Sequence, residues 1–360
     1  MPSWDPQLLA AGAYKYAPYL GVADLENEFR AWRLLYHEDG STATVSVREM
    51  AGQRSLVIDG KVDASNMGDM LTQRLLGLLP VLLHRQPESV LVLGLGSGVT
   101  AASALAPGAT QRRDLVEISP EVVQASAFFS KETGSVLSAA GVNLIVADGR
   151  SHLAFTTRQY DVIVSEPSNP WMAGIAALFT REFFETARAR LKPDGVICQW
   201  AHTYDISPGD LKSIVRTFTS VFPESTMWLV GDGDLLLIGT NGAAIESHLA
   251  ALAADWRSES TSKTLWDVTV SDAQMPFLLM SLLVGGPSEM QRYSSGATVQ
   301  TDDRMALEFT GPRAIYGRSV ADNTAEILRL ADGEPSSPAA RAILARATDD
   351  AWAAAGAMEI

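Results

Sequence analysis

The stretch Leu91-Val-Leu-Gly-Leu-Gly-Ser-Gly-Val-Thr100 decides the fold of this chain. It joins an apolar run that begins at Ser89 to a small-residue helical pattern over 99–105, with Gly94, Gly96 and Gly98 between the two. This order predicts a strand, a tight turn and a helix start, because glycine adopts positive φ and lets the backbone approach a ligand. The helix start adds unpaired N–H groups and a partial positive charge. The stretch therefore favours a nucleotide-type loop, although a glycine-rich turn can also simply end a strand.

An acidic residue at the end of the next apolar strand strengthens this interpretation. Glu117 lies in the strand expected over 114–118, and it follows Gly94 by 23 residues. In dinucleotide sites, a carboxylate that binds the ribose hydroxyls follows the glycine loop by about 20 residues. We therefore expect Glu117 to hold a ribose.

Strands and helices alternate after this point. We expect strands over 89–93, 114–118, 142–147, 160–165 and 195–200. Two further strands, over 225–230 and 234–239, are separated only by Gly231-Asp-Gly233, so they form an antiparallel hairpin, because a parallel crossover needs a dozen or more residues. A parallel sheet closed by an edge hairpin is typical of the seven-stranded class I methyltransferase-like (Rossmann-like) α/β fold.

The pattern divides the chain into three parts. Residues 1–68 read as an N-terminal segment with a small antiparallel β domain, 69–320 as the main α/β domain, and 321–360 as a peripheral helical tail. The apolar run over 277–284 reads as a buried helix. No run reaches the ~18 apolar residues of a membrane span, and the N-terminus lacks a signal-peptide pattern, so we expect a cytoplasmic chain without membrane insertion.

Composition excludes several functions. The chain has 28 Lys and Arg against 42 Asp and Glu, and this net charge of −14 argues against a nucleic-acid partner. It is compatible with a cationic substrate, although a solvated acidic surface is the better explanation of the charge alone. Cys198 is the only cysteine, and the five histidines show no metal-binding spacing, so we expect neither a disulfide nor a metal site.

Candidate chemical residues follow the strand ends, where ligands bind in open parallel sheets. Asp148-Gly149 follows the 142–147 strand and could accept a hydrogen bond from an adenine amino group, but Asp-Gly is also a turn signal. Glu166 follows the 160–165 strand and could take a proton from an attacking amine, or could merely cap local N–H groups. Trp171 either lines the same pocket or packs on the core, and Tyr204 lies on the same edge.

Over roughly 30–240 the chain resembles the spermidine synthase (polyamine aminopropyltransferase) family, and in particular the branch found as domains fused to membrane transporters. The matching motifs are Leu56-Val-Ile-Asp-Gly60, Thr72-Gln73, Gly94-Leu-Gly-Ser-Gly98, Val116-Glu-Ile118, Ala147-Asp-Gly149, Tyr160-Asp-Val-Ile-Val164 and Leu191-Lys-Pro-Asp-Gly-Val-Ile-Cys-Gln199. The resemblance implies a small β domain before a methyltransferase-like domain. It also implies aminopropyl transfer from decarboxylated S-adenosylmethionine to a polyamine, without a metal, in a homodimer.

The resemblance also implies residue roles. Glu166 falls on the catalytic aspartate of the family, Glu117 on its ribose-binding glutamate and Asp148 on its adenine-side aspartate. The remaining donor-binding positions are Gly94, Gly96, Ser97, Gly98, Ile118 and Gly149. The remaining acceptor-binding positions are Gln73, Asn169, Trp171, Gln199 and Tyr204.

Three positions depart from the family pattern. Ser97 replaces an aspartate that binds the amine of the aminopropyl group, Asn169 replaces an aspartate that binds the polyamine, and Thr72 replaces a tyrosine. The Pro-Thr-Tyr stretch of the family is also missing. Each lost carboxylate weakens the binding of an ammonium group by about 1.5–3 kcal/mol.

These departures leave two alternatives to aminopropyl transfer. Ser97 at a helix start tolerates an anion, which suits the carboxylate of intact S-adenosylmethionine and hence an amine methyltransferase. The second alternative is a non-catalytic nucleoside- or polyamine-binding module that regulates a partner.

Overall fold

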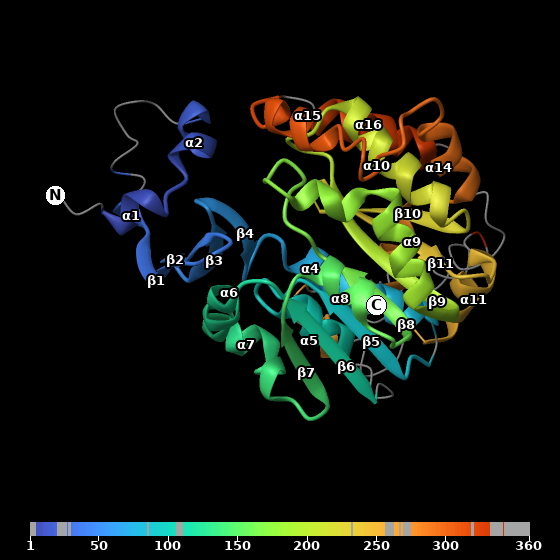
Figure 1. The fold of residues 1–360 in the computed structure, drawn as a ribbon, viewed down its shortest axis with the longest axis horizontal. Coiled ribbons are helices and arrows are strands. Elements are labelled where there is room, and N and C mark those ends of the chain that lie inside the picture. Colours follow the sequence, from blue (N-terminus) through green and yellow to red (C-terminus); the bar gives the residue numbers. More distant parts are fainter. Residues whose placement is uncertain are drawn as a thin grey trace, which may run out of the picture.

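The chain forms two β-sheets, and the smaller one stands beside the larger α/β body (Figure 1). A computed structural model describes residues 5–19, 27, 30–84, 86–105, 111–231, 233–255, 263–265, 268, 275–317, 320–331 and 341. The predicted α/β class with a preceding antiparallel β unit is confirmed. Among the residues described, no helix is both long and apolar enough to cross a bilayer.

The N-terminal sheet has four antiparallel strands in the order β1-β2-β3-β4. Their bounds are β1 Arg33–Asp39, β2 Thr44–Met50, β3 Gln53–Ile58 and β4 Lys61–Ser65. Val45, Val47 and Leu56 are fully buried and join the same apolar cluster as the first long helix of the main domain. The sheet is therefore packed onto the α/β body, and its last strand reaches toward the edge where a ligand is expected.

The main sheet has eight strands in the order β12-β10-β11-β9-β8-β5-β6-β7. The strands are β5 Ser89–Leu93, β6 Arg112–Glu117, β7 Val142–Val146, β8 Tyr160–Ser165, β9 Leu191–His202, β10 Ser225–Val230, β11 Asp234–Thr240 and β12 Leu283–Gly285. The strands from β7 across to β9 are parallel, whereas β11 is antiparallel to both β9 and β10. The predicted edge hairpin is therefore confirmed.

Two expectations about the sheet were wrong in detail. The sheet has eight strands and not seven, because Leu283–Gly285 pairs with the exposed edge of β10 after the helix α13 (Met275–Leu282) ends. Open N–H and C=O groups on an edge strand attract such an addition. Strand β9 also runs on to His202, since β11 pairs with it along this extension.

Helices cover both faces of the main sheet. The helices are α4 Met70–His84, α5 Val99–Leu105, α6 Pro120–Ala125, α7 Ser130–Thr133, α8 Gly149–Phe155, α9 Arg181–Arg190, α10 Pro208–Val221, α11 Ile245–Asp255, α14 Pro287–Tyr293, α15 Leu307–Ala314 and α16 Val320–Leu328. Shorter helical turns are α1 Pro6–Leu9, α2 Ala13–Tyr16, η1 Ala17–Tyr19, η2 Ser126–Phe129, η3 Val136–Ser138, η4 Ile175–Phe179 and η5 Arg329–Ala331.

Side chains that alternate along each strand pack into two separate hydrophobic cores, one on each face of the sheet. In β5, Val90 and Val92 join the cluster beneath α4, α5 and α11, while Leu91 and Leu93 join the cluster beneath α8, α9 and α10. A strand buried on both faces is expected to be a continuous apolar run, as 89–93 is. The expected division at 68/69 stays a prediction, and of the 321–360 tail only 321–331 and 341 lie within the described residues.

The glycine loop lies against the end of the neighbouring strand. Gly94, Gly96 and Gly98 all have positive φ, of 94°, 52° and 87°. A Cβ atom on Gly94 would lie 2.5 Å from the carbonyl oxygen of Glu166. Only glycine permits this approach, so the loop between β5 and α5 directly abuts the segment that follows β8.

The contact between α4 and α5 gives a first test of this packing. A Cβ atom on Gly77 of α4 would lie 2.2 Å from the carbonyl oxygen of Thr100 in α5. We expect Gly77→Ala to destabilise the fold by about 1–3 kcal/mol through overpacking, although alanine normally favours a helix. Gly209→Ala in α10 is the matched control, because the nearest atom to its added Cβ is 3.9 Å away. Chemical denaturation measures both variants, and equal stability would contradict the close approach.

Candidate active site

The carboxylate of Glu117 connects the glycine loop to the start of α6. Glu117 Oε2 accepts a hydrogen bond from the Leu95 N–H at 2.9 Å, and Oε1 accepts one from the Ser119 N–H at 2.9 Å. Burial raises the pKa of Glu117, and these two N–H groups oppose the rise. Each carboxylate oxygen keeps a further acceptor position, which is the arrangement that a pair of ribose hydroxyls requires.

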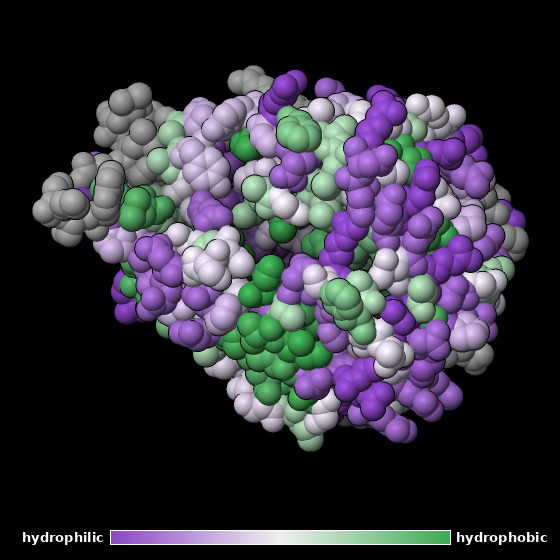
Figure 2. Space-filling view, viewed as in Figure 1, coloured by the Kyte–Doolittle hydropathy of each residue, from purple (hydrophilic) through white to green (hydrophobic). Residues whose placement is uncertain are grey.

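Asp148 lies beyond the end of the next strand over, β7. Its Oδ1 accepts a hydrogen bond from the Ser151 N–H at 2.7 Å and so caps α8, which begins at Gly149. One oxygen of Asp148 is therefore used as a helix cap, while Oδ2 remains available to a ligand. Ile118 and Val146 near the same edge are 48% and 52% exposed. Figure 2 shows apolar surface over this part of the molecule, as a flat aromatic ring would require.

Ser97 does not face outward. Its side chain is 2% exposed, its hydroxyl donates to Gln73 Oε1, and it accepts a hydrogen bond from the Val99 N–H at 3.2 Å. Gln73 Nε2 in turn donates to Asp69 Oδ2 at 3.0 Å. The Ser97 hydroxyl is therefore already hydrogen-bonded, and this hydrogen-bonded chain, the Ser97–Gln73–Asp69 relay, ends at the Asp69 carboxylate. Both observations argue against the expectation that Ser97 binds the carboxylate of intact S-adenosylmethionine.

Glu166 has the electrostatics of a proton acceptor. Its Oε2 atom is buried and has no hydrogen-bond partner. Burial raises the pKa of the Glu166 carboxyl well above its ordinary value of 4.5, and the negative charges of Asp63, Asp69 and Asp234 raise it further, while a hydrogen bond from Thr100 opposes them. A carboxyl with a raised pKa is a stronger base once it has lost its proton.

Four more buried polar atoms near the ends of β8 and β9 lack partners. They are Ser165 Oγ, Asn169 Oδ1, Trp171 Nε1 and Gln199 Oε1. Native proteins leave few such atoms unpaired, and a group of them at a strand-end edge indicates a missing polar ligand. With Glu166 Oε2, the group contains three acceptors, one donor and one hydroxyl that can act as either. The surroundings therefore favour a ligand that carries N–H groups.

The structure adds residues that sequence reasoning missed. Asp63 on β4 accepts a hydrogen bond from the Ser168 hydroxyl at 2.9 Å and lies 3.4 Å from Lys61 Nζ. Asp69 precedes α4, and Asp234 begins β11. Asp69 opens the stretch of family resemblance that holds Thr72-Gln73, but no motif marked Asp63 or Asp234, because the three carboxylates come from separate elements that only the fold brings together. Their charges act on Glu166 and make the site strongly acidic.

An aromatic wall completes the site. The Tyr204 ring stacks on the His202 ring with centroids 4.5 Å apart, and the Trp200 ring lies 5.1 Å beyond His202. Burial lowers the pKa of His202 to about 3, so this ring is neutral. Trp171 is 7% exposed and packs against Gly311 of α15, so it belongs to the core while its Nε1 stays unpaired.

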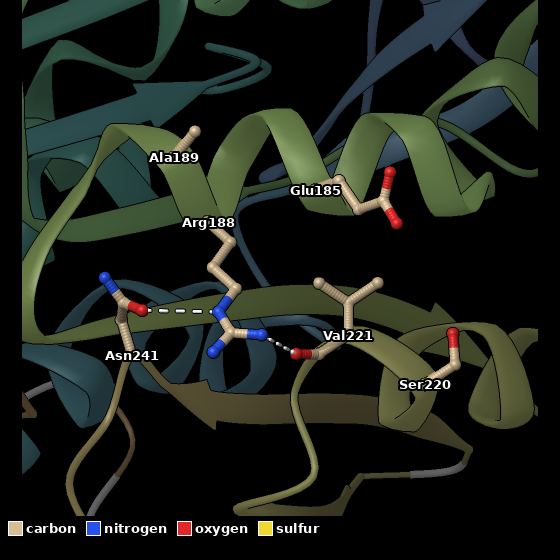
Figure 3. Close-up of a pocket in the computed structure, with 6 residues that line it drawn as sticks. All are labelled: Glu185, Arg188, Ala189, Ser220, Val221 and Asn241. Carbon is tan, nitrogen blue, oxygen red and sulfur yellow. Dashed lines mark hydrogen bonds between the residues drawn. The ribbon is translucent and has the colours of Figure 1, made fainter.

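The hollow in Figure 3 lies away from these residues. Its walls are Glu185, Arg188, Ala189, Ser220, Val221 and Asn241, near the amino ends of the parallel strands. Arg188 donates to Asn241 Oδ1 at 3.3 Å and to the Val221 carbonyl at 3.0 Å. The Arg188 guanidinium is thus engaged in hydrogen bonds within the protein. Within the part of the chain that is described, no three His, Cys, Asp or Glu side chains form a metal-binding group.

Together, the strand order and the glycine loop define a methyltransferase-like α/β fold. Residues 70–231 match the family model of the spermine/spermidine synthase domain. The predicted resemblance to the spermidine synthase family is confirmed over these residues, whereas the transporter-fused branch stays a prediction.

Curated relatives agree with this assignment. Polyamine aminopropyltransferase 2 of Hyperthermus butylicus is 31% identical over 49% of this chain and 59% of its own length. Polyamine aminopropyltransferase of Ruegeria sp. is 27% identical over 61% of this chain and 74% of its own length. The chain thus spans about three fifths of the first of these relatives.

Solved structures agree in fold. Spermidine synthase from Thermotoga maritima superposes with a TM-score of 0.55 at 21% identity, covering 67% of this chain and 85% of that one. A spermidine synthase solved in complex with the transition state analogue AdoDATO gives a TM-score of 0.54 at 20% identity, covering 67% of this chain and 85% of that one. These likenesses support the methyltransferase-like fold.

The raised pKa of Glu166 predicts a pH-dependent stability. Above about pH 4.5 an unfolded Glu166 loses its proton while the folded residue keeps it, so the wild type loses stability as the pH rises toward the folded pKa. Glu166→Gln removes this loss. We therefore expect its Tm advantage over the wild type to grow with pH, on the scale of about 2–4 °C per kcal/mol.

Differential scanning fluorimetry between pH 5 and pH 9 measures this effect. Glu185→Gln, at an exposed position of α9, is the control and should track the wild type. A Tm difference for Glu166→Gln that stays constant over the whole range would contradict a buried, raised-pKa carboxyl.

Proposed function

We propose that this chain transfers an aminopropyl group from decarboxylated S-adenosylmethionine to an amine of a polyamine. The observation that carries the proposal is the set of unpartnered buried acceptors, Glu166 Oε2, Asn169 Oδ1 and Gln199 Oε1, within an acidic site. An amine supplies the N–H donors and the positive charge that such a site lacks. The names of the curated relatives agree with this activity.

We assign the donor to the glycine-loop edge. The Gly94–Gly98 backbone would approach the nucleoside, with Glu117 on the ribose hydroxyls and Asp148 Oδ2 on the adenine amino group. Ile118 and Gly149 flank the ring. The Ser97–Gln73–Asp69 relay favours the decarboxylated donor, because the Asp69 carboxylate attracts a terminal ammonium and repels the carboxylate of intact S-adenosylmethionine.

The chemistry is a single displacement. The acceptor nitrogen attacks the aminopropyl methylene carbon that is bonded to the sulfonium, so a C–N bond forms as the C–S bond breaks. Sulfur takes the bonding electrons and leaves as neutral methylthioadenosine, and the proton of the amine passes to Glu166. Positioning of the two reactants supplies much of the rate, since the sulfonium is already activated.

The binding of a cationic acceptor should also change the charge of the base. An ammonium beside Glu166 favours its ionised form and lowers its pKa, so the substrate itself prepares the carboxylate. Gln199 and Tyr204 would then line the acceptor. A neutral His202 adds no opposing charge to this wall.

We also propose a homodimer in the cytoplasm that binds no nucleic acid. The free edge of β1 in the small sheet supports self-association, because an unpaired edge strand can pair with a second copy. A single free, buried cysteine suits a reducing compartment. The net charge of −14 opposes binding to phosphate backbones.

Product analysis tests the reaction. The wild type, incubated with a diamine and decarboxylated S-adenosylmethionine, should release methylthioadenosine by mass spectrometry. Glu166→Gln should lower kcat by about 10²–10⁴-fold, the usual contribution of a general base. Glu185→Gln should leave the rate unchanged.

Other outcomes identify the alternatives. Release of adenosylhomocysteine from intact S-adenosylmethionine would replace this proposal with amine methylation. Donor binding without any turnover would favour a regulatory module. Full activity of Glu166→Gln with an unchanged pH profile would remove Glu166 as the base.

A further inference from the structure

We infer that Asp234 binds the far ammonium of a diamine acceptor, while Glu166 receives the reacting amine at the other end. The inference rests on the proposed function for the reaction, but its test is a binding measurement that needs no turnover. It assigns the acceptor to the class of short, linear dications.

Neutral donors hold the Asp234 carboxylate in place. Oδ2 accepts a hydrogen bond from the Thr72 hydroxyl at 2.7 Å, and Oδ1 accepts from Trp200 Nε1 at 3.2 Å and from the Tyr204 hydroxyl at 3.4 Å. Among the ion pairs between described residues, none includes Asp234. The carboxylate is therefore oriented by its neighbours without being neutralised at contact distance.

An unpartnered amide oxygen beside Asp234 provides an independent indication of a ligand. Asn169 is fully buried, and its Oδ1 has no hydrogen-bond partner. His202 Nδ1 donates to the Tyr204 carbonyl, so His202 Nε2 carries a lone pair and accepts from Asn169 Nδ2 at 3.0 Å. This bond fixes the orientation of the amide. Its free oxygen needs a donor, and an ammonium group offers three.

Asn169 and Asp234 belong to one corner of the site. Asn169 Nδ2 is bonded to His202, whose ring stacks on that of Tyr204, and the Tyr204 hydroxyl reaches Asp234. The carboxylate and the amide oxygen are thus connected through two adjacent rings. Ammonium groups are bound by such mixed sets of oxygen acceptors, because each N–H can take a different oxygen.

Two of the departures from the family pattern meet at Asp234. Thr72, which replaces a tyrosine, donates directly to Asp234. Asn169, which replaces a polyamine-binding aspartate, connects to Asp234 through His202 and Tyr204. The negative charge that the loop after β8 has lost is therefore supplied by the first residue of β11. The substitutions thus relocate an ammonium subsite and do not abolish it.

The rings beside Asp234 suit a methylene chain. Trp200 and Tyr204 both contact Asp234, the His202 ring stacks on Tyr204 and lies tilted to Trp200, and His202 is neutral. Glu166 and Asp234 lie close enough for each charge to affect the other. A dication with a short aliphatic linker satisfies both carboxylates, whereas a monoamine leaves Asp234 unpaired.

Calorimetry with two amines tests the inference. The wild type should bind 1,4-diaminobutane more tightly than 1-aminobutane. Asp234→Asn keeps the shape of the side chain but removes its charge, so the affinity for the diamine should fall at least about tenfold while that for the monoamine changes less than about twofold. Asp322→Asn, an equal loss of charge at an exposed position of α16, should alter neither.

Asp234→Glu is a second variant that tests the inference even if Asp234→Asn folds poorly. The longer side chain brings the carboxylate closer to Glu166, so the preference should shift from 1,4-diaminobutane toward 1,3-diaminopropane. An unchanged ratio of diamine to monoamine affinity in Asp234→Asn, or an unchanged chain-length preference in Asp234→Glu, would overturn the inference. A wild type that binds the diamine as described but forms no methylthioadenosine would refute aminopropyl transfer and leave this subsite intact.

Discussion

The pairing of β5 with β8 at their carboxyl ends is the constraint on which the site depends. The Glu166 N–H donates to the Leu93 carbonyl at 2.9 Å, and the glycine that follows Leu93 has no Cβ to keep the two segments apart. The loop that would hold a nucleoside and the segment that carries the proposed base are therefore adjacent. A side chain at Gly94 would separate them, so donor binding and proton transfer both rely on one close backbone contact.

Burial of several carboxylates around a single lysine, Lys61, is the second feature of this site. Glu166, Asp69 and Asp234 all have raised pKa values, mainly because of burial. Such an arrangement costs stability in the free protein, since like charges repel one another in a medium of low dielectric constant. Under the proposed function, a cationic ligand would remove this cost when it binds, so that stability is exchanged for affinity toward an amine.

The structure changes the interpretation of the three positions that depart from the spermidine synthase pattern. In the sequence, Ser97, Asn169 and Thr72 are three losses of amine-binding groups. In the fold, Ser97 connects through Gln73 to Asp69, and Thr72 contacts Asp234. Lost carboxylates have close replacements that come from other elements. A motif comparison alone does not show these contacts, because they join residues of separate elements.

The sequence alone determined the parts of this protein that depend on local patterns. Apolar runs, glycine spacing and the short 231–233 link predicted the strands, the glycine loop and the closing hairpin, since backbone geometry and burial follow from neighbouring residues. Glu117 and Glu166 were found in the same way, because each lies at or just past the end of a buried strand. Only the tertiary structure decided the strand count, the inward turn of Ser97 and the presence of Asp234 in the site. These features depend on contacts between residues far apart in the chain, such as Thr72 with Asp234, and no local pattern encodes them.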